Sequence, residues 1–480
     1  MEVFNVLSSA VIWIYGTTHN IHLDWIGELI RLLIVGVGSV GVGVILFSVI
    51  LKVIVLPFDV YQRITMRKQN LKMKENQAKM EKLQKQYANN KEMYNQKVME
   101  MYKESGISPC SSCLPLILSM VIFIVAINAF NAYAQFANVK NYNDMVQAYN
   151  TELTTYCADL TPDETDEYLV ITPTDDGYLK VTDSRADKYI YYVVDAPDNF
   201  DVNAIKESDY TYITGAGKSY YVDVEKALAN TAIKTAVDAA VAKDTSENTL
   251  EKKTANAVSN YFIGKAQHAV IGAYNNTVYP NSSFLWIKNV WETDAVYKTA
   301  VVDYKTFEEQ AKQQKFKVEG VGEVSYANIG AHTGKNPNPY TSEAYNNVTG
   351  ALTEQKSAPN GYFILIVLSI GTILLQQIIS MRSQKEQQKY SSVDGQGASQ
   401  QKMMLVIMTI MFAVFSFMYS SAFSIYMIMS NVLSLISTVI INKIVDVVAE
   451  KNEEKALLKK YDNKRISVKN DDKKSGKKGK

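Results

Sequence analysis

The sequence predicts a polytopic α-helical membrane protein with a five-span core, a cytoplasmic helical hairpin and an inserted extracytoplasmic α+β domain. Five apolar stretches approach the length of about 20 residues that a helix needs to cross a bilayer. Charge supports the same prediction, because the 50 basic and 49 acidic residues of the 480-residue chain concentrate in different segments. An apolar content of 47% excludes a disordered chain, and a count of three cysteines excludes a disulfide scaffold.

Residues 1–37 are expected to form an outer N-terminal segment that ends in an interfacial amphipathic helix. Residues 3–15 are apolar but too short to span a bilayer, and they lack the basic region of a signal peptide. Residues 25–35 carry Glu28 and Arg31 among Ile and Leu, a pattern typical of a helix that lies on the membrane surface.

The five spans are assigned to residues 38–58, 113–132, 360–380, 403–419 and 422–442. The first span overlaps a G-x-G-x-x-G pattern at Gly36, Gly38 and Gly41, which resembles a dinucleotide-binding fingerprint. That fingerprint opens an amphipathic helix in a βαβ unit. Here a long apolar run follows, in which Lys52 is the only charge before Pro57. The glycines therefore indicate close packing of helices in lipid.

The segments between the spans differ in charge, and this difference predicts the orientation. Residues 59–112 contain eleven Lys or Arg, residues 443–480 contain thirteen, and the short connection 381–402 is also basic. Residues 134–358 instead contain 31 acidic and 20 basic residues. Because basic loops stay in the cytoplasm, we expect the N-terminus and the insert 133–358 outside and the C-terminus in the cytoplasm.

The cytoplasmic segment 59–112 is predicted to be an antiparallel helical hairpin with a narrow apolar seam. Its apolar residues recur at helical spacing in two stripes, Met66, Met73, Met80, Leu83 and Tyr87, then Tyr94, Val98, Met101 and Tyr102. Asn90 is suited to cap the second helix and Gly106 to end it. Two interpretations stay open, a Met-rich docking arm for clients or partners and a solvated hairpin without such a role.

The insert 133–358 is predicted to hold a small α+β domain. Strands are expected at 168–171, 178–182, 189–194, 210–214 and 220–224, and helices at 224–242 and 249–274. The turn Asp175-Asp176-Gly177 joins the first two strands as a hairpin. The Gly- and Asn-rich segment 318–359 is expected to be a loop. The role of the insert is open between client binding, contact with cell-wall components and mere filling of space, and we expect the spans to fold without it.

The sequence contains no cluster that indicates covalent catalysis, a metal or a cofactor. Cys110 and Cys113 form a C-x-x-C motif, but a zinc site needs a second pair, and Cys157 is predicted across the membrane. The four histidines are scattered, and no nucleotide-binding motif stands out. The protein is therefore expected not to be an enzyme and to use no cofactor.

Several short motifs, in one order along the chain, resemble the YidC/Oxa/Alb family of membrane protein insertases. They are VILKVIVLPFDVYQRITMRKQ at 49–69, MYKESGISPCSSCLPLILSMVIF at 101–123, SFLWIKNVW at 283–291, LLQQ at 374–377, QKMM at 401–404, IYMIMSN at 425–431 and INK at 441–443. Members of this family have a basic residue five positions before the proline of the first span, and Lys52 and Pro57 have this spacing.

The sequence also departs from the family at several positions. Lys52 stands where Arg is usual, and Ser119, Val121, Thr409 and Ser437 stand where Gln, Pro, Pro and Gln are common. The outer loop between the second and third spans is normally short, yet here it exceeds 200 residues. These departures bear on the range of clients more than on the fold.

The resemblance implies an insertase and folding chaperone of the bacterial plasma membrane that moves client segments into the bilayer without ATP. It also implies that the basic residue lines a hydrophilic groove open to cytoplasm and lipid. The candidate groove residues are Lys52, Ser119, Asn128, Gln376, Tyr426, Ser430 and Asn431. Alternatively, Lys52, about 8–9 Å from the inner end of its span, extends its amine to the headgroups. The other residues are alternatively interhelical hydrogen-bond partners.

Two other classes of protein compete with this prediction. A surface receptor or accessory protein would use insertase-like spans only to anchor the outer domain. Such an anchor needs neither a basic residue in the first span nor the cytoplasmic hairpin, so these two features favour the insertase. Transporters tend to show internal repeats, and no repeat is visible here.

The expected partners are nascent membrane-protein clients, the lipid bilayer and the ribosome, with the Sec translocon as an open alternative. Residues 451–480 are rich in Lys and contain Tyr461 as their one aromatic residue. A polycation of this kind binds RNA phosphates through counterion release. The alternative is that this tail only enforces orientation or touches anionic lipid.

Overall fold

The computed structural model describes thirteen stretches of the chain, residues 11–14, 17–20, 25–106, 114–156, 169–173, 179–183, 190–192, 210–214, 219–318, 322–325, 340–383, 396–445 and 447. The chain divides into two compact units. Unit 1 comprises Met1–Val44, Ala126–Ile364 and Phe417–Phe423, and unit 2 comprises Ile45–Val125, Leu365–Ser416 and Ser424–Lys480. All three cysteines and the predicted tail 451–480 lie outside the described residues.

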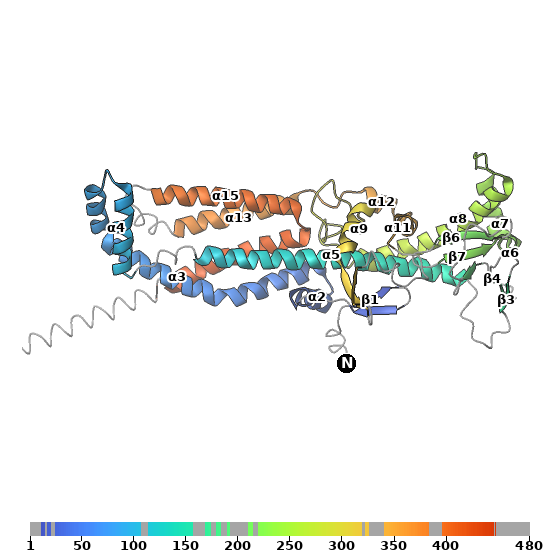
Figure 1. The fold of residues 1–480 in the computed structure, drawn as a ribbon, viewed down its shortest axis with the longest axis horizontal. Coiled ribbons are helices and arrows are strands. Elements are labelled where there is room, and N and C mark those ends of the chain that lie inside the picture. Colours follow the sequence, from blue (N-terminus) through green and yellow to red (C-terminus); the bar gives the residue numbers. More distant parts are fainter. Residues whose placement is uncertain are drawn as a thin grey trace, which may run out of the picture. The chain divides into compact units, whose positions relative to one another are not determined.

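Unit 2 is built from long helices (Figure 1). It draws on α3 (Val40–Gln86), α4 (Lys91–Glu104), α5 (Leu114–Tyr156), α13 (Ile364–Ser383), α15 (Gln396–Met418) and the helix Ser421–Val445. Four of the described helices are long and apolar enough to cross a membrane, and Thr409–Met418 within α15 is a shorter apolar helix. The class predicted from the sequence, a polytopic helical membrane protein, is confirmed, while the count of five spans stays a prediction.

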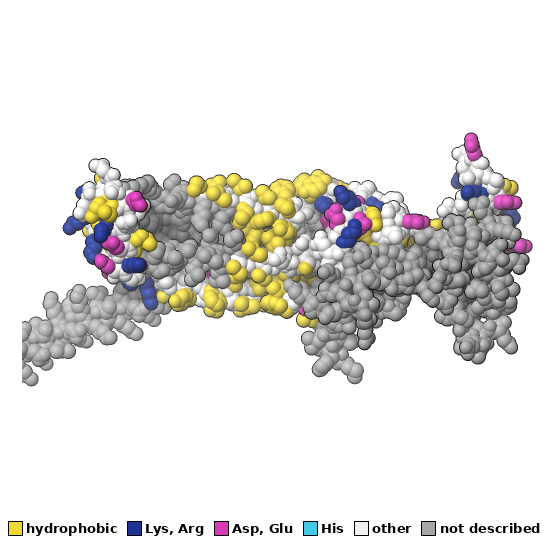
Figure 2. All heavy atoms as spheres, viewed as in Figure 1, with side chains coloured by type: hydrophobic (Ala, Val, Ile, Leu, Met, Phe, Trp, Pro, Cys, Tyr) yellow, Lys and Arg dark blue, Asp and Glu magenta, His cyan; other side chains and the backbone are white. Residues whose placement is uncertain are grey.

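The outer faces of these helices are apolar. Val53, Ile54, Val406, Ile407 and Ile440 each expose more than half of their surface. Figure 2 shows hydrophobic side chains gathered over the apolar helices, whereas Lys and Arg gather at α4 and the neighbouring end of α3. A contiguous apolar surface of this kind marks contact with lipid or protein.

The predicted hairpin is present as α4 and the end of α3. The side-chain oxygen of Asn90 accepts a hydrogen bond from the Met93 N–H at 3.0 Å, so Asn90 caps α4 as expected. Gly106 has φ +61°, a left-handed conformation that suits glycine after a helix. Met80 and Met101 are buried, and the Tyr102 hydroxyl of α4 reaches Met80 Sδ of α3 at 3.4 Å; Met66 is also buried, further back along α3. The cytoplasmic position of the hairpin stays a prediction.

Unit 1 contains small antiparallel sheets and a set of shorter helices. The hairpin of β3 (Leu169–Pro173) and β4 (Leu179–Asp183) lies where the turn Asp175-Asp176-Gly177 predicts it. A three-stranded sheet has the order β5 (Ile190–Tyr192), β7 (Ser219–Asp223) and β6 (Tyr210–Thr214). The helices that follow are α6 (Val224–Ala229), α7 (Thr231–Val241) and α8 (Leu250–Ala273), with η3 (Tyr274–Val278) as a π-helical end. These elements agree with the predicted α+β composition.

Two details at the start of the chain and along α5 differ from the sequence prediction. The short strands β1 (Val11–Ile14) and β2 (Thr17–Asn20) pair before the predicted helix α2 (Trp25–Val37). Helix α5 continues through the predicted end of the second span at residue 132, because the apolar stripe of the span is followed by a buried stripe that includes Tyr142, Tyr149 and Leu153.

The prediction of a loop at 318–359 is wrong for much of that segment. It contains β9 (Gly322–Ser325), which pairs with β8 (Lys315–Val318), and the helices α11 (Ser342–Thr349) and α12 (Thr353–Ser357). The Thr341 hydroxyl accepts from the Ala344 N–H at 3.2 Å and caps α11. The buried residues Tyr345 and Val348 hold this helix in the core of unit 1 despite the local Asn and Gly content.

Tyrosines fill that core. Tyr142 on α5 makes ring contacts with Phe307 on α9 (Tyr304–Gln313), with Tyr340 and with Tyr345, at centroid distances of 4.6, 6.0 and 5.0 Å. The Tyr345 hydroxyl donates to the Val302 carbonyl at 2.6 Å, which satisfies its buried polar end. This cluster accounts for part of the concentration of tyrosine in the insert.

The glycine pattern at the start of the first span has a structural explanation. Gly38 has φ +70° and its N–H bonds to the Ile34 carbonyl at 2.9 Å, so it ends α2. A side chain at Gly41 would overlap the ring of Phe284. The pattern therefore serves a turn at Gly38 and a close approach of Gly41 to Phe284; a side chain at Gly36 or Gly38 would meet no atom of the described residues within 4 Å, so the predicted packing of helices against these two glycines is not seen.

Candidate functional site

Lys52 lies in the apolar first part of α3, residues 40–58, and makes a polar contact there. Its Nζ donates to Oδ2 of Asp59 at 2.6 Å and to the Ser434 hydroxyl at 3.0 Å. The two charged side chains expose 16% and 27% of their surface. Lys52 is therefore paired with a carboxylate and a hydroxyl.

The pairing follows from helix geometry. Lys52 and Asp59 are seven residues apart, which places them on one face of α3, two turns and about 10.5 Å along the axis. The long Lys side chain closes this gap beside Pro57, which lies inside the helix. Asp59 also attracts Arg63, one turn further along α3. Sequence reasoning missed Asp59 as a partner, although the i, i+7 spacing was a usable signal.

The last helix, which carries Ser434, also carries three of the other predicted residues. Asn431 is buried and its Nδ2 donates to the Thr372 hydroxyl of α13 at 3.4 Å. Tyr426 is also buried, and its ring lies 6.3 Å from that of Phe47 on α3. Ser430 is half-buried one turn after Tyr426. Ser434, one turn beyond Ser430, completes the polar side of this helix and was not predicted.

Of the remaining predicted residues, Gln376 makes no hydrogen bond with Lys52 in the part of the chain that the structure describes. Asn128 is exposed and belongs to the part of α5 in unit 1. The side chain of Ser119 lies outside the described residues. Gln376 is half-buried, and it is the neighbouring Gln377 whose Oε1 accepts from the Thr409 hydroxyl at 2.7 Å.

Thr409 is one of the departures from the family pattern, where proline is common. Its hydroxyl joins α15 to α13 through Gln377, and buried Ser369 and Ser416 join the same two helices at 3.0 Å. These contacts are interhelical hydrogen bonds of the kind that stabilise packing in lipid. Asn431, one of the polar residues considered from the sequence, makes a contact that fits this interpretation as well.

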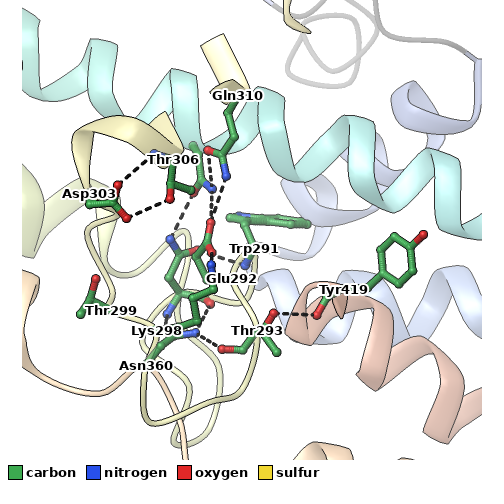
Figure 3. A network of polar contacts seen from close by, with 12 residues as sticks. Trp291, Glu292, Thr293, Lys298, Thr299, Asp303, Thr306, Gln310, Asn360 and Tyr419 are labelled. Carbon is green, nitrogen blue, oxygen red and sulfur yellow. Dashed lines mark hydrogen bonds and ion pairs between the residues drawn. The ribbon is translucent and has the colours of Figure 1, made fainter. Parts of the chain in front are cut away.

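A second polar network lies in unit 1, around Glu292 (Figure 3). The buried carboxylate accepts hydrogen bonds from Asn138 Nδ2 at 3.0 Å and Gln310 Nε2 at 3.1 Å. Lys298 Nζ lies 3.7 Å away. Burial raises the pKa of Glu292, while Lys298 and the two amides act in the opposite direction.

The chain around Glu292 is hydrogen-bonded to two other segments, the start of the last helix and the residues just before α13. The Glu292 carbonyl accepts from the Ser421 N–H at 2.8 Å and from its hydroxyl at 2.7 Å, at the start of the last helix. Asn360, just before α13, donates through Nδ2 to the carbonyls of Asn289 and Thr293 at 2.9 and 3.0 Å. Sequence reasoning identified 283–291 as a family segment but not this clamping role.

Apolar helices in a polytopic arrangement, with a paired cation inside one of them, define a helical membrane protein with an internal polar site. Residues 33–173 and 273–450 match the 60Kd inner membrane protein family, and the chain belongs to it. This is the YidC/Oxa/Alb family that the motifs resemble. Residues 174–272, between the two matched segments, lie within the predicted insert.

Similar proteins with curated descriptions carry the name membrane protein insertase YidC. The chain is 35% identical over 98 residues to the one from Caldanaerobacter subterraneus, covering 20% of this chain and 46% of that protein. It is 36% identical over 86 residues to the one from Fusobacterium nucleatum, covering 18% and 40%. It is 39% identical over 88 residues to the one from Clostridium perfringens, covering 18% and 35%. The chain thus spans less than half the length of each of these relatives, and no solved structure matches it.

Proposed function

We propose that the protein is a membrane protein insertase and folding chaperone, which moves client segments into the bilayer without ATP. Its family membership and the name of its relatives support this proposal. The observation that carries it is Lys52, a largely buried cation in an apolar helix, with its Nζ bonded to Asp59 and Ser434. A charge at the centre of a span costs about 2.5–3.5 kcal/mol on insertion scales, so it marks a functional position by default.

The chemistry of insertion explains why such a position is useful. A polar client segment loses its hydration when it enters hydrocarbon, and each unsatisfied polar group costs several kcal/mol there. A groove lined by Lys52 and by polar groups of the last helix, such as Ser430 and Asn431, offers replacement partners partway across. The barrier to insertion then falls without a continuous pore and without nucleotide hydrolysis.

The same proposal includes an orientation. Five spans, an outer N-terminus and a cytoplasmic C-terminus place the hairpin of α3 and α4 and the basic tail on the cytoplasmic side, where nascent clients, ribosomes and the Sec translocon are met. An engineered surface cysteine on α7 is expected to react with an impermeant reagent in intact cells. Protection of this cysteine until the cells are lysed would invert the topology.

A second candidate is a surface protein that uses the spans as an anchor. It is favoured by residues 174–272, which interrupt the family match, and by the separate core of unit 1. Complementation of an insertase-depleted bacterium separates the two. The insertase proposal expects the wild-type chain to restore growth and client insertion, whereas a chain that accumulates in the membrane and restores neither is only an anchor.

A further inference from the structure

We propose that Asp59 is a specificity-determining residue. It is an internal counter-ion that pairs with Lys52 and competes with acidic client segments for the Lys52 ammonium. The inference rests on the proposed insertase function and deepens it. It follows from the contact of 2.6 Å between Lys52 Nζ and the Asp59 carboxylate.

The geometry makes Asp59 a mimic of a client carboxylate. The Asp59 oxygen sits at hydrogen-bond distance from the ammonium that a client acid would seek, and Ser434 takes a second proton of the same group. An ammonium has three donors, and among the described residues Asp59 and Ser434 take two of them, so the third is available to a client. Both charged side chains keep some exposure, so the pair is reachable from the surface.

The charge balance sets the preference. With Asp59 in place, an approaching client carboxylate meets a paired cation and is repelled by Asp59, so it must displace that residue. A neutral polar segment meets a pair whose charges already compensate each other. Asp59 therefore shifts the range of clients away from strongly acidic segments and toward neutral ones.

The pair also changes how the effect of a Lys52 substitution on insertion is interpreted. Removing one member of a buried pair leaves the other charge uncompensated, whereas removing both members is often tolerated. Lys52→Ala leaves the Asp59 carboxylate facing the client, and part of the resulting defect comes from that carboxylate. Lys52→Ala/Asp59→Asn removes this repulsion.

The test uses the purified full-length chain in liposomes and two single-span clients that differ only in their translocated segment, which carries Asp residues in one and Asn in the other. We expect Asp59→Asn to raise the ratio of acidic to neutral client inserted several-fold, and Asp59→Glu to keep the wild-type ratio. Ser434→Ala, the matched control, removes a hydrogen bond to the same ammonium without changing charge and should leave the ratio unaltered.

The double variant gives a second, independent comparison. Lys52→Ala/Asp59→Asn is expected to insert the acidic client several-fold better than Lys52→Ala, and this comparison remains available if the single Asp59→Asn variant folds poorly. An unchanged ratio in Asp59→Asn, or no gain in the double variant, overturns the role of Asp59. Failure of the wild-type chain to insert either client instead overturns the insertase proposal itself.

Discussion

Two carboxylate–amine pairs among the described residues differ in the partners that satisfy them. Glu292 exposes 6% of its side chain, receives two amide hydrogen bonds and lies 3.7 Å from Lys298. The pair of Lys52 and Asp59 is closer, at 2.6 Å. The Asp59 carboxylate, at 27%, is more exposed than that of Glu292, whereas Lys52, at 16%, is less exposed than Lys298, at 37%, and also donates to the Ser434 hydroxyl.

This difference separates a structural pair from a functional one. Around Glu292, neutral amides and backbone groups fix the carboxylate, and the same segment holds the start of the last helix through Ser421. A fully satisfied buried network of this kind rigidifies a fold. The Lys52 pair has few fixed partners and some exposure, so a client group has the means to exchange into it.

The largest effect on insertion is expected from substitution of Lys52, the amine of the less satisfied pair. Lys52→Ala should slow insertion of clients with acidic outer segments at least about tenfold, a change in barrier of about 1.4 kcal/mol, whereas Lys52→Arg should retain activity because it keeps the charge. Pulse-labelling of clients in insertase-depleted cells measures both variants. Insertion at the wild-type rate by Lys52→Ala would remove this residue from the site.

The Glu292 network should respond in stability and not in client choice. Glu292→Ala leaves Gln310 Nε2 without its acceptor and Asn138 Nδ2 with only the Gln310 side-chain oxygen at 3.1 Å, and an unsatisfied buried donor costs about 1–3 kcal/mol. Thermal unfolding in detergent should report this loss, and Glu292→Gln, which preserves shape and one acceptor, should lose less. Equal stability of Glu292→Ala and wild type would show that the network does not hold the fold.

The stability of unit 1 should also depend on pH through Glu292. Because burial raises the pKa of Glu292 above its ordinary value of 4.5, the folded state binds this proton more tightly than the unfolded state. The contribution of Glu292 to stability is then greatest below pH 4.5 and falls as pH rises through the raised pKa. Melting curves from pH 4 to 7 should show a decrease that is absent in Glu292→Gln, and a parallel decrease in both proteins would contradict the assignment.

Removal of the outer strands should have a smaller effect on insertion. Replacing residues 157–248 by a flexible linker keeps α5 and α8, which meet through the rings of Tyr156 and Phe262 at 5.2 Å. We expect insertion within about twofold of wild type, because the Lys52 site and residues 157–248 belong to different compact units and sites without shared partners usually act independently. A loss of insertion with normal membrane accumulation would give this part of the chain a direct role in client handling.

The smallest expected effect concerns the basic tail. Truncation after Val448 removes the Lys-rich residues 451–480, and ribosome co-sedimentation should weaken most at low salt, since phosphate contacts are salt-dependent. Insertion of clients added after translation should be nearly unchanged. Equal co-sedimentation of truncated and full-length protein would limit the tail to orientation or lipid contact.

Periodic features of the fold were predictable from sequence, and contacts between distant segments were not. The apolar runs, the cap at Asn90 and the hairpin turn at Asp175-Asp176-Gly177 are local signals. The helix α11 was missed because Tyr345 and Val348 are held by tertiary packing that overrides a Gly- and Asn-rich composition. The site shows the same division, since Lys52 stood out as a charge in an apolar run, whereas Ser434 became visible only in three dimensions.

The most direct test of the central claim is insertion of a client by the purified protein alone in liposomes, without ATP or any other protein. The account predicts that wild-type protein inserts a short-tailed single-span client well above the level of empty liposomes, and that Lys52→Ala falls toward that level for an acidic client. Insertion by wild type no greater than by empty liposomes, with the protein folded and correctly oriented, would contradict it.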